Sequence, residues 1–358
     1  MKPRLNISYT FRDYCVLVKS LFTKRKRESE NFYVNHSRVA LRIALSALNL
    51  DKGAGVGVMI YNCHTVFNAI RLAGYKPVFI DVTDDFTIDL QDLERKKNQI
   101  SACVVTHLFG YINDIDSIKN ICPNIPIIED CAHAYLSEYN NKYAGDFGDI
   151  ATFSIGHAKF PSVGSGGYIK VNNNNFLEEV NREFQVCKYP PFTSELKSIL
   201  NMFFLQCMYS KFLFGLLTHR MVKKKNISNV LVDERESRIC KTVFSLYKQK
   251  LTKCRNNKAM QNNTKEDLTV FLKSHFKDLY FPKVLLNSSY NDFMFPTLSY
   301  NRIEIINHFE EKGVELGTHF SKSIQWASQF GYEIGDCLNA EKISEQIVVF
   351  PTYYKFVK

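Results

Sequence analysis

The chain has 358 residues, which is too long for one small domain and about right for two. Hydrophobic residues make up 45% and charged residues 23%, so we expect a globular protein with a sizeable core. The formal net charge of +10 suits nucleic acid, an anionic membrane face or anionic substrates, but basic and aromatic residues do not interleave as in a nucleic-acid platform, which excludes nucleic acid as a partner.

Much of the positive charge lies in two runs, Lys24–Arg27 and Lys223–Lys225, and runs of this kind are usually solvated surface. The ten cysteines are scattered without a C-x-x-C pair, so we expect reduced thiols rather than a disulfide frame or a metal site. Residues 1–14 contain no apolar core of a signal peptide. These features together predict a cytoplasmic protein.

From residue 36 to 172, helical and strand-like patterns alternate. Apolar residues recur at helical spacing in 37–50, 65–75, 90–98 and 112–122. Short apolar runs typical of strands occupy 55–61, 76–82, 101–108 and 125–130. The alternation predicts an α/β fold with a mostly parallel sheet, which binds ligands at the carboxyl ends of its strands. Asp130 and the turn 62–65 lie at such ends.

The second half of the chain has weaker patterns. Two further strands are predicted at 151–155 and 167–171, on either side of Lys159, and residues 172–260 read as mostly helical. The last hundred residues mix strands at 294–300 and 313–320 with a helix at 302–313. We therefore predict a large domain over 1–255, with an apolar helical insertion at about 190–235, and a smaller α+β domain over 256–358.

The stretch 196–219 is rich in aromatic and aliphatic residues, but Lys197 and Lys211 interrupt it. Its longest uninterrupted run is too short for a bilayer span, which needs about 20 apolar residues. Two interpretations remain open. The stretch is a core or subunit-interface helix, which we favour, or residues 196–225 make peripheral contact with the inner face of a membrane, helped by Lys223–Lys225.

The chemistry centres on Lys159, which lies between a short apolar strand and Gly164, Gly166 and Gly167. A lone lysine beside glycines is most often a surface residue in a turn. Asp130, however, ends a buried strand, and a buried carboxylate needs a cationic partner, such as a protonated pyridine nitrogen. The Ser154 hydroxyl, the glycines and the amides at the start of the helix at Ser37 suit a phosphate. A lysine amine, a carboxylate and phosphate-binding amides are the parts that hold pyridoxal phosphate.

Several segments resemble the DegT/DnrJ-type sugar-nucleotide aminotransferases. GDFGDIATFSIGHAKFPSVGSGG (145–167) is similar to the family motif G-S-F-G-D-x-x-x-F-S-F-x-x-x-K-x-x-x-x-G-x-G-G, with Lys159 at the Schiff-base position, and IIEDCAHA (127–134) is similar to E-D-x-A-Q-A. Further resemblances are AIRLAGYKPVFIDV (69–82), THLFGYINDID (106–116) and CLNAEKISEQIVVFPTY (337–353). The likeness is strong over residues 36–175 and looser over 290–352.

The resemblance implies a pyridoxal phosphate-dependent transferase of fold type I, like aspartate aminotransferase. The implied enzyme moves an amino group from L-glutamate to a keto group of a nucleotide-linked deoxy sugar, in the biosynthesis of lipopolysaccharide or another surface polysaccharide. A homodimer is also implied, because family sites are shared between subunits.

The resemblance also implies a role for each site residue. Lys159 would be the catalytic residue and bind the cofactor, and Asp130 would pair with its pyridine nitrogen. His133, in place of the usual Gln, would donate a hydrogen bond near the ring hydroxyl. The remaining cofactor contacts are expected from Ser37, Arg38 and Ser154 at the phosphate and from Cys63 or His64 at the ring face. His319 is a weak candidate for substrate contact.

The chain departs from the family in two places. The family's N-Y-R segment after the lysine is not recognisable, and Ser165 replaces a Glu before the double glycine. A non-catalytic or membrane-docked relative with a structural or regulatory role is therefore the alternative. Sugar 3-dehydration ranks low, because those relatives have His at the position of Lys159. A dinucleotide-dependent oxidoreductase is excluded, because no G-x-G-x-x-G follows the first strand.

Overall fold

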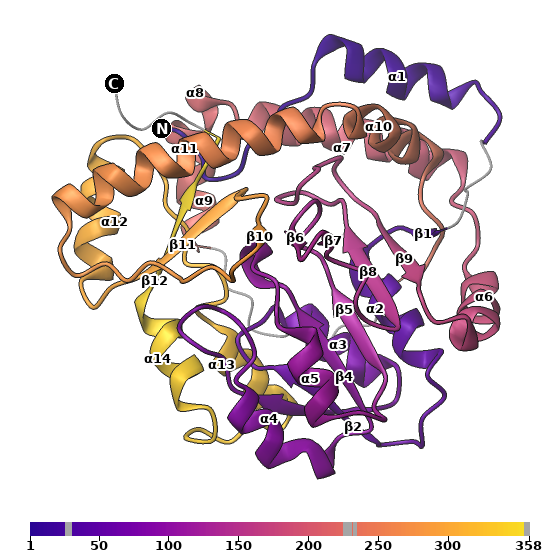
Figure 1. The fold of residues 1–358 in the computed structure, drawn as a ribbon. Coiled ribbons are helices and arrows are strands. Elements are labelled where there is room, and N and C mark those ends of the chain that lie inside the picture. Colours follow the sequence, from indigo (N-terminus) through magenta and orange to yellow (C-terminus); the bar gives the residue numbers. More distant parts are fainter. Residues whose placement is uncertain (26–30, 225–230, 232–234, 354–358) are drawn as a thin grey trace.

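The structure is a computed structural model that describes residues 1–25, 31–224, 231 and 235–353. Its centre is a seven-stranded sheet in the order β1-β9-β8-β5-β4-β2-β3 (Figure 1). The five strands from β8 to β3 are parallel, whereas β9 is antiparallel to both β8 and β1. The strand bounds are β1 Phe32–Val34, β2 Gly55–Met59, β3 Lys76–Ile80, β4 Ala102–Thr106, β5 Ile127–Asp130, β8 Ile150–Ser154 and β9 Gly167–Val171. The predicted α/β fold with a mostly parallel sheet is confirmed.

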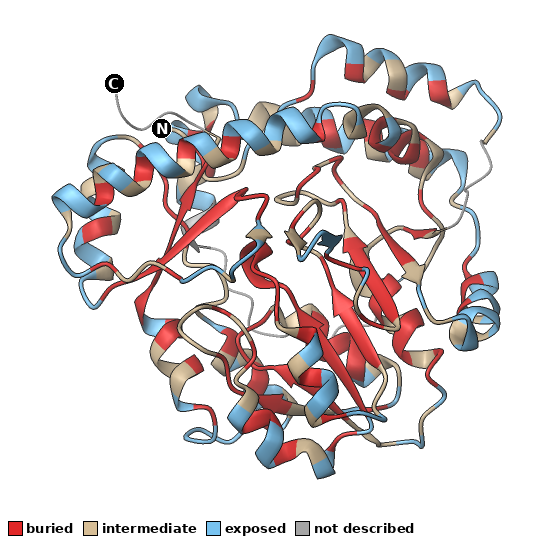
Figure 2. Cartoon of the chain, viewed as in Figure 1, coloured by how far each residue is buried: buried red, intermediate tan, exposed pale blue. Residues whose placement is uncertain are grey.

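Helices cover the sheet because their apolar residues recur on one side. The helix α2 (Ser37–Ser46) buries Val39, Leu41, Ile43 and Leu45 and lies against β8 and β9. The crossover helices are α3 (His64–Leu72), α4 (Leu90–Lys96) and α5 (Ile115–Ile121). Figure 2 shows the strands almost wholly buried between these layers. Every predicted helix and strand between residues 36 and 172 is therefore present.

Helices dominate the next hundred residues, as predicted. They are α6 (Leu177–Val186), α7 (Phe192–Met208), α8 (Lys211–Leu213), the π-helix η4 (Phe214–Thr218), α9 (His219–Lys224), α10 (Lys241–Leu251) and α11 (Cys254–His275). The N-terminal helix α1 (Phe11–Leu21) packs on α10 and α7 at one end of the molecule (Figure 1). Among the described residues no single helix has the length and apolar character to cross a membrane, although the bent pair of α7 and residues 211–221 meets both criteria together.

The C-terminal part has a small hydrophobic cluster of its own. The antiparallel pair β11 (Met294–Leu298) and β12 (Ile347–Pro351) packs with α12 (Arg302–Glu311) and the second half of α11 around Phe295, Phe309 and Phe350. The predicted strand at 294–300 and helix at 302–313 are confirmed. The strand predicted at 313–320 is wrong, because Val314 and Gly317 each form only an isolated bridge before the chain turns at Phe320, whose φ is +61°. A domain boundary near residue 255 stays a prediction.

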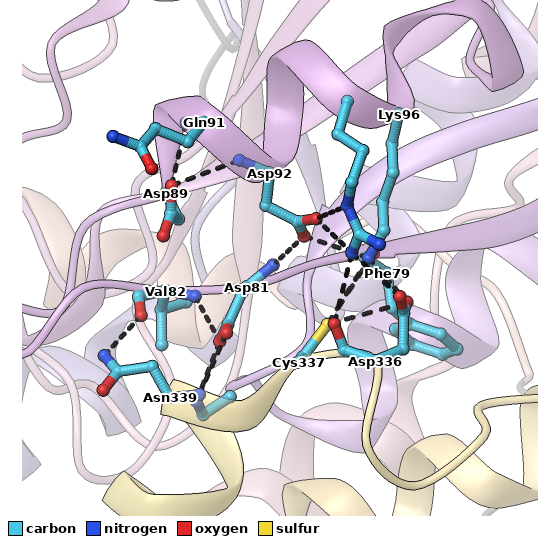
Figure 3. Close-up of polar contacts among 12 residues, drawn as sticks. Phe79, Asp81, Val82, Asp89, Gln91, Asp92, Lys96, Asp336, Cys337 and Asn339 are labelled. Carbon is cyan, nitrogen blue, oxygen red and sulfur yellow. Dashed lines mark hydrogen bonds and ion pairs between the residues drawn. The ribbon is translucent and has the colours of Figure 1, made fainter.

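A polar network ties the C-terminal helix α14 (Leu338–Gln346) to the large sheet (Figure 3). The Asp81 carboxylate at the end of β3 accepts hydrogen bonds from the backbone N–H groups of Asn339 and Ala340, at the start of α14. The buried Lys96 ammonium donates to Asp92 (2.9 Å), Asp336 (2.6 Å) and the carbonyl of Phe79. These contacts hold the start of the 337–353 segment against the large sheet.

Candidate active site

A cavity of about 340 Å³ lies at the carboxyl ends of the parallel strands. Such a volume is typical of a small-molecule site. The sheet sets its position, because β4, β5 and β8 end at Thr106, Asp130 and Ser154, which all line the cavity. Seven of the nine site residues expected from the sequence line it: Ser37, Arg38, Cys63, Asp130, His133, Ser154 and Lys159.

Asp130 is held on the cavity wall with its side chain buried. Its carboxylate accepts a hydrogen bond from the Ala132 backbone N–H (3.1 Å) and one from the Thr106 hydroxyl (3.3 Å), which in turn accepts from the Asn62 amide (2.8 Å). Burial raises the pKa of Asp130, and the nearby positive charge of Lys159 offsets part of that rise. Asp130 therefore has a fixed orientation and gains from a further cation, which fits a protonated pyridine nitrogen.

Lys159 reaches the cavity from the loop between β8 and β9. This loop folds back on itself, since the N–H of His157 donates to the Gly164 carbonyl (3.2 Å) and the N–H of Val163 to the Ile155 carbonyl (2.9 Å). Ala158, directly before the lysine, has a φ of +59°, in the left-handed region that residues with a Cβ adopt at a cost. Burial lowers the pKa of Lys159, although Cys63 and Asp130 act to raise it. The amine is thus easier to deprotonate than an ordinary lysine.

The tautomer of His133 follows from its contacts. The Phe109 backbone N–H donates to Nδ1 of His133 at 3.1 Å, so Nδ1 is the acceptor and the proton of the neutral ring lies on Nε2. Burial, with Lys159 and His319 nearby, holds the pKa of His133 well below its usual value, so the ring is neutral. Phe320 stacks on it at 5.7 Å. A neutral, buried Nε2–H donor fits the ring hydroxyl of the cofactor.

The position expected for the phosphate lies at the start of α2, which Gly167 allows to approach β9 closely. A Cβ on Gly167 would lie 2.5 Å from Cα and 2.6 Å from N of Ser37, so only glycine lets β9 approach the helix this closely. The first turn of α2 contains no acidic residue, and its N-cap residue makes no capping hydrogen bond through its side chain. The positive end of the helix dipole is therefore directed at the cavity beside Ser154, which suits a dianionic phosphate.

Glu129 anchors the GDFGD segment beneath the site. Its carboxylate accepts hydrogen bonds from the backbone N–H groups of Gly145, Phe147 and Gly148, and a buried His107 ring nitrogen lies 2.9 Å away. These bonds lower the pKa of Glu129 against the effect of burial, and His107 contributes most. Cys131 lies near enough to His107 and Glu129 for the three to hold a metal ion, but both Glu129 oxygens are already used in hydrogen bonds.

Two predicted residues lie outside the cavity lining. The His64 ring packs edge-on against Trp326 at 5.0 Å, so of the two candidates for the ring face only Cys63 lines the cavity. His319 is behind Phe320, its backbone carbonyl accepting from the Tyr61 hydroxyl (2.6 Å), and burial holds its pKa well below the usual value. A role for His319 in substrate contact stays a prediction.

The cavity is also lined by residues that were not predicted as site residues, among them Asn62, Thr106, His157 and Phe320. Asn62 and Thr106 form the hydrogen-bond chain to Asp130, and Phe320 packs on His133. His157 also lines the cavity, and its Nδ1 is buried without a hydrogen-bond partner in the described part of the chain. Thr106 was detectable as a polar residue that ends an apolar strand. Phe320 was not, because only the tertiary fold brings it to the cavity.

Comparison with known proteins agrees with this geometry. Residues 27–195 match the model of the DegT/DnrJ/EryC1/StrS aminotransferase family. This part of the chain is therefore similar to that family. Over 149 residues it is 35% identical to GDP-perosamine synthase of Escherichia coli O157:H7, a match that covers 40% of this chain and 41% of the relative. Over 153 residues it is 31% identical to the UDP-4-amino-4,6-dideoxy-N-acetyl-beta-L-altrosamine transaminase of Campylobacter jejuni, covering 41% and 40%. The chain thus spans about two fifths of the length of these curated relatives.

Solved structures extend the likeness in fold to almost the whole chain. The sugar aminotransferase CalS13 from Micromonospora echinospora superposes with a TM-score of 0.76 at 14% identity, covering 99% of this chain and 96% of that one. The aminotransferase from Psychrobacter cryohalolentis gives a TM-score of 0.75 at 17% identity, covering 96% and 92%. The fold of a pyridoxal phosphate-dependent aminotransferase is therefore present outside the family segment too.

Proposed function

We propose that this protein is a pyridoxal phosphate-dependent aminotransferase that moves an amino group from L-glutamate to a keto group of a nucleotide-linked deoxy sugar. The observation that carries the proposal is the meeting of Lys159, Asp130 and the start of α2 around one cavity. The names of the family relatives, GDP-perosamine synthase and a UDP-amino-sugar transaminase, support a nucleotide-linked sugar as the acceptor. Such a product belongs to surface polysaccharide biosynthesis in the cytoplasm.

Pyridoxal phosphate, when bound, supplies an aldehyde that reacts with amines and a ring that withdraws electrons from the carbon next to the nitrogen. Lys159 supplies the amine that attaches the cofactor. Once it is no longer attached, Lys159 would be a free base placed to take a proton from the α-carbon of the amino donor. A lowered pKa increases the share of that base near neutral pH.

The other residues hold and polarise the cofactor. The Asp130 carboxylate keeps the ring nitrogen protonated, and Thr106 and Asn62 fix the direction in which it points. His133 would donate a hydrogen bond from its Nε2–H group to the ring oxygen. Ser154 and the amides of Ser37 and Arg38 bind the phosphate, with Cys63 at the ring face.

The test is an absorbance spectrum of the purified protein before and after L-glutamate is added. We expect a yellow band that bleaches with glutamate in the wild type, and no such band in Lys159→Ala. Lys170→Ala is the matched control, because Lys170 lies on β9 and pairs with Asp146 on the surface. A band that persists unchanged in Lys159→Ala would contradict the role of Lys159.

A band without bleaching would point to a different donor. Wild-type protein that never binds pyridoxal phosphate would favour the non-catalytic alternative. The proposed homodimer is tested separately, by sedimentation equilibrium with the cofactor bound.

A further inference from the structure

Two neighbouring helical segments expose an unusual amount of apolar surface. On α1, Phe11, Val18 and Phe22 recur every seven and four residues and form one stripe, opposite the buried Asp13, Leu17 and Ser20. Phe11 and Phe22 are 85% and 82% exposed. This stripe has no structural role in the core, because the other side of α1 already packs on α10 and α7.

The second segment is 192–221, within the predicted apolar insertion. One side of α7 is buried through Glu195, Ile199 and Met202. The rest of the segment exposes large apolar side chains: Phe192, Leu196, Leu200, Phe203, Phe204, Phe212, Leu216, Leu217 and Met221. Of the core or subunit-interface helix favoured from the sequence, only one side is thus part of the core.

The two apolar surfaces adjoin each other. The Tyr14 ring of α1 contacts the Phe203 ring of α7 at 6.2 Å, and the Tyr14 hydroxyl donates to Gln206 at 2.6 Å. We call the exposed side chains of 11–25 and 192–221 the apolar face. An exposed apolar patch of this kind marks a binding surface for a protein or a membrane.

The charges on the apolar face decide between these partners. The structure describes all of 11–25 and 192–221, and the only acidic residues there, Asp13 and Glu195, are buried. Asp13 pairs with Lys250 (2.8 Å), and Glu195 accepts hydrogen bonds from Lys241 and Thr242. The exposed charged residues are all basic: Arg12, Lys19, Lys24, Lys197, Lys211 and Arg220.

We propose that the apolar face binds the surface of an anionic lipid bilayer, with its aromatic and aliphatic side chains inserted among the headgroups. Aromatic rings flanked by lysine and arginine are what an interfacial segment needs, because the rings enter the acyl boundary while the cations pair with lipid phosphates. A second copy is a poorer occupant, since pairing the face with itself brings like charges together. The inference does not depend on the proposed enzymatic activity.

The test is co-sedimentation of the full-length protein with vesicles. One set contains phosphatidylcholine alone and the other contains a quarter of phosphatidylglycerol. We expect binding to the anionic vesicles at low salt, and at least tenfold weaker binding to the neutral vesicles or at high salt.

Two variants and one control separate the parts of the face. Leu200→Ser/Phe203→Ser/Phe204→Ser removes apolar contacts, and Lys197→Glu/Lys211→Glu/Arg220→Glu reverses the charge; each should lower the bound fraction at least tenfold. The control is Ile334→Ser/Leu338→Ser, whose side chains are 79% and 69% exposed beside α14, and it should bind like the wild type. Unchanged thermal melting of each variant shows that it is folded.

Either of two outcomes overturns the proposal. One is wild-type protein that stays in solution with both kinds of vesicle at low salt. The other is a folded triple-serine variant that binds vesicles like the wild type. If that variant instead loses a dimer seen by sedimentation equilibrium while vesicle binding is absent, a second copy covers the face.

Discussion

Gly167→Ala is a direct test of the phosphate position, because the added methyl group has nowhere to go. An ideal Cβ at residue 167 lies 2.5 Å from Cα of Ser37, 2.6 Å from its N and 2.7 Å from the carbonyl oxygen of Phe153. All three are backbone atoms, so no side-chain rotation relieves the contact. The first turn of α2 must move away from β9. Overpacking of this kind costs about 1–3 kcal/mol of stability.

The same displacement moves the amides of α2 away from the phosphate. We expect the affinity for pyridoxal phosphate to fall about tenfold, which corresponds to about 1.4 kcal/mol. Affinity for pyridoxal, which lacks the phosphate, should change little. Fluorescence or absorbance titration with each ligand gives both values, and urea denaturation gives the loss of stability.

Gly156→Ala is the matched control, in the loop that precedes β9. A Cβ there has only an ordinary contact, 3.7 Å from the Ser154 hydroxyl, and Gly156 also lines the cavity. This variant should keep both affinities and its stability within about 0.5 kcal/mol. The reasoning fails if Gly167→Ala behaves like Gly156→Ala, or if it weakens pyridoxal as much as pyridoxal phosphate.

Two further substitutions test buried titratable side chains. His133 is neutral in the folded protein, so only the unfolded chain takes up its proton, and stability falls as the pH drops below about 6.5, by up to about 1.4 kcal/mol per pH unit. His133→Gln should reduce that slope between pH 6.5 and 5.5 in urea denaturation, and an unchanged slope contradicts the assignment. Lys96→Met leaves the buried Asp92 without one of its cationic partners and should lower the unfolding free energy by about 2–4 kcal/mol. Arg95→Met, on the exposed side of the same network, should lower it far less. Equal losses for the two variants would contradict the larger contribution of the buried Lys96.

Much of the sheet and of the cofactor site followed from local sequence. An apolar run that ends in a polar residue placed Asp130 at a strand end, and parallel strands bring such ends to one edge. Lys159 followed from its combination with Asp130 and the glycines and from its match to the lysine of the family motif. The strand predicted at 313–320 was wrong because Val314 and Gly317 each form only an isolated bridge to a distant residue. A strand-like composition therefore does not produce a continuous ladder there.

Other features depend on contacts between distant residues. The tautomer of His133 is set by the backbone of Phe109, and its packing by Phe320, which is 187 positions further along the chain. The orientation of α7 also depends on contacts between distant residues. Apolar residues occur on more than one side of this helix, so composition cannot say which side faces the core, and only the packing of Ile199 and Met202 decides it.

The position of α7 connects the apolar face with the cofactor loop. A Cβ on Gly164 would lie 3.0 Å from the Met202 methyl group, and one on Gly166 would lie 3.0 Å from the Ile239 side chain. The loop that carries Lys159 therefore packs against Met202 of α7 and against Ile239. Phe203 and Phe204 follow Met202 directly but are 58% and 59% exposed. Substitutions at Phe203 and Phe204 should therefore change lipid binding alone. A substitution at Met202 should instead disturb the packing of the loop that carries Lys159. The proposed binding to a membrane and the proposed binding of the cofactor should thus be separable by substitutions at neighbouring positions on one helix.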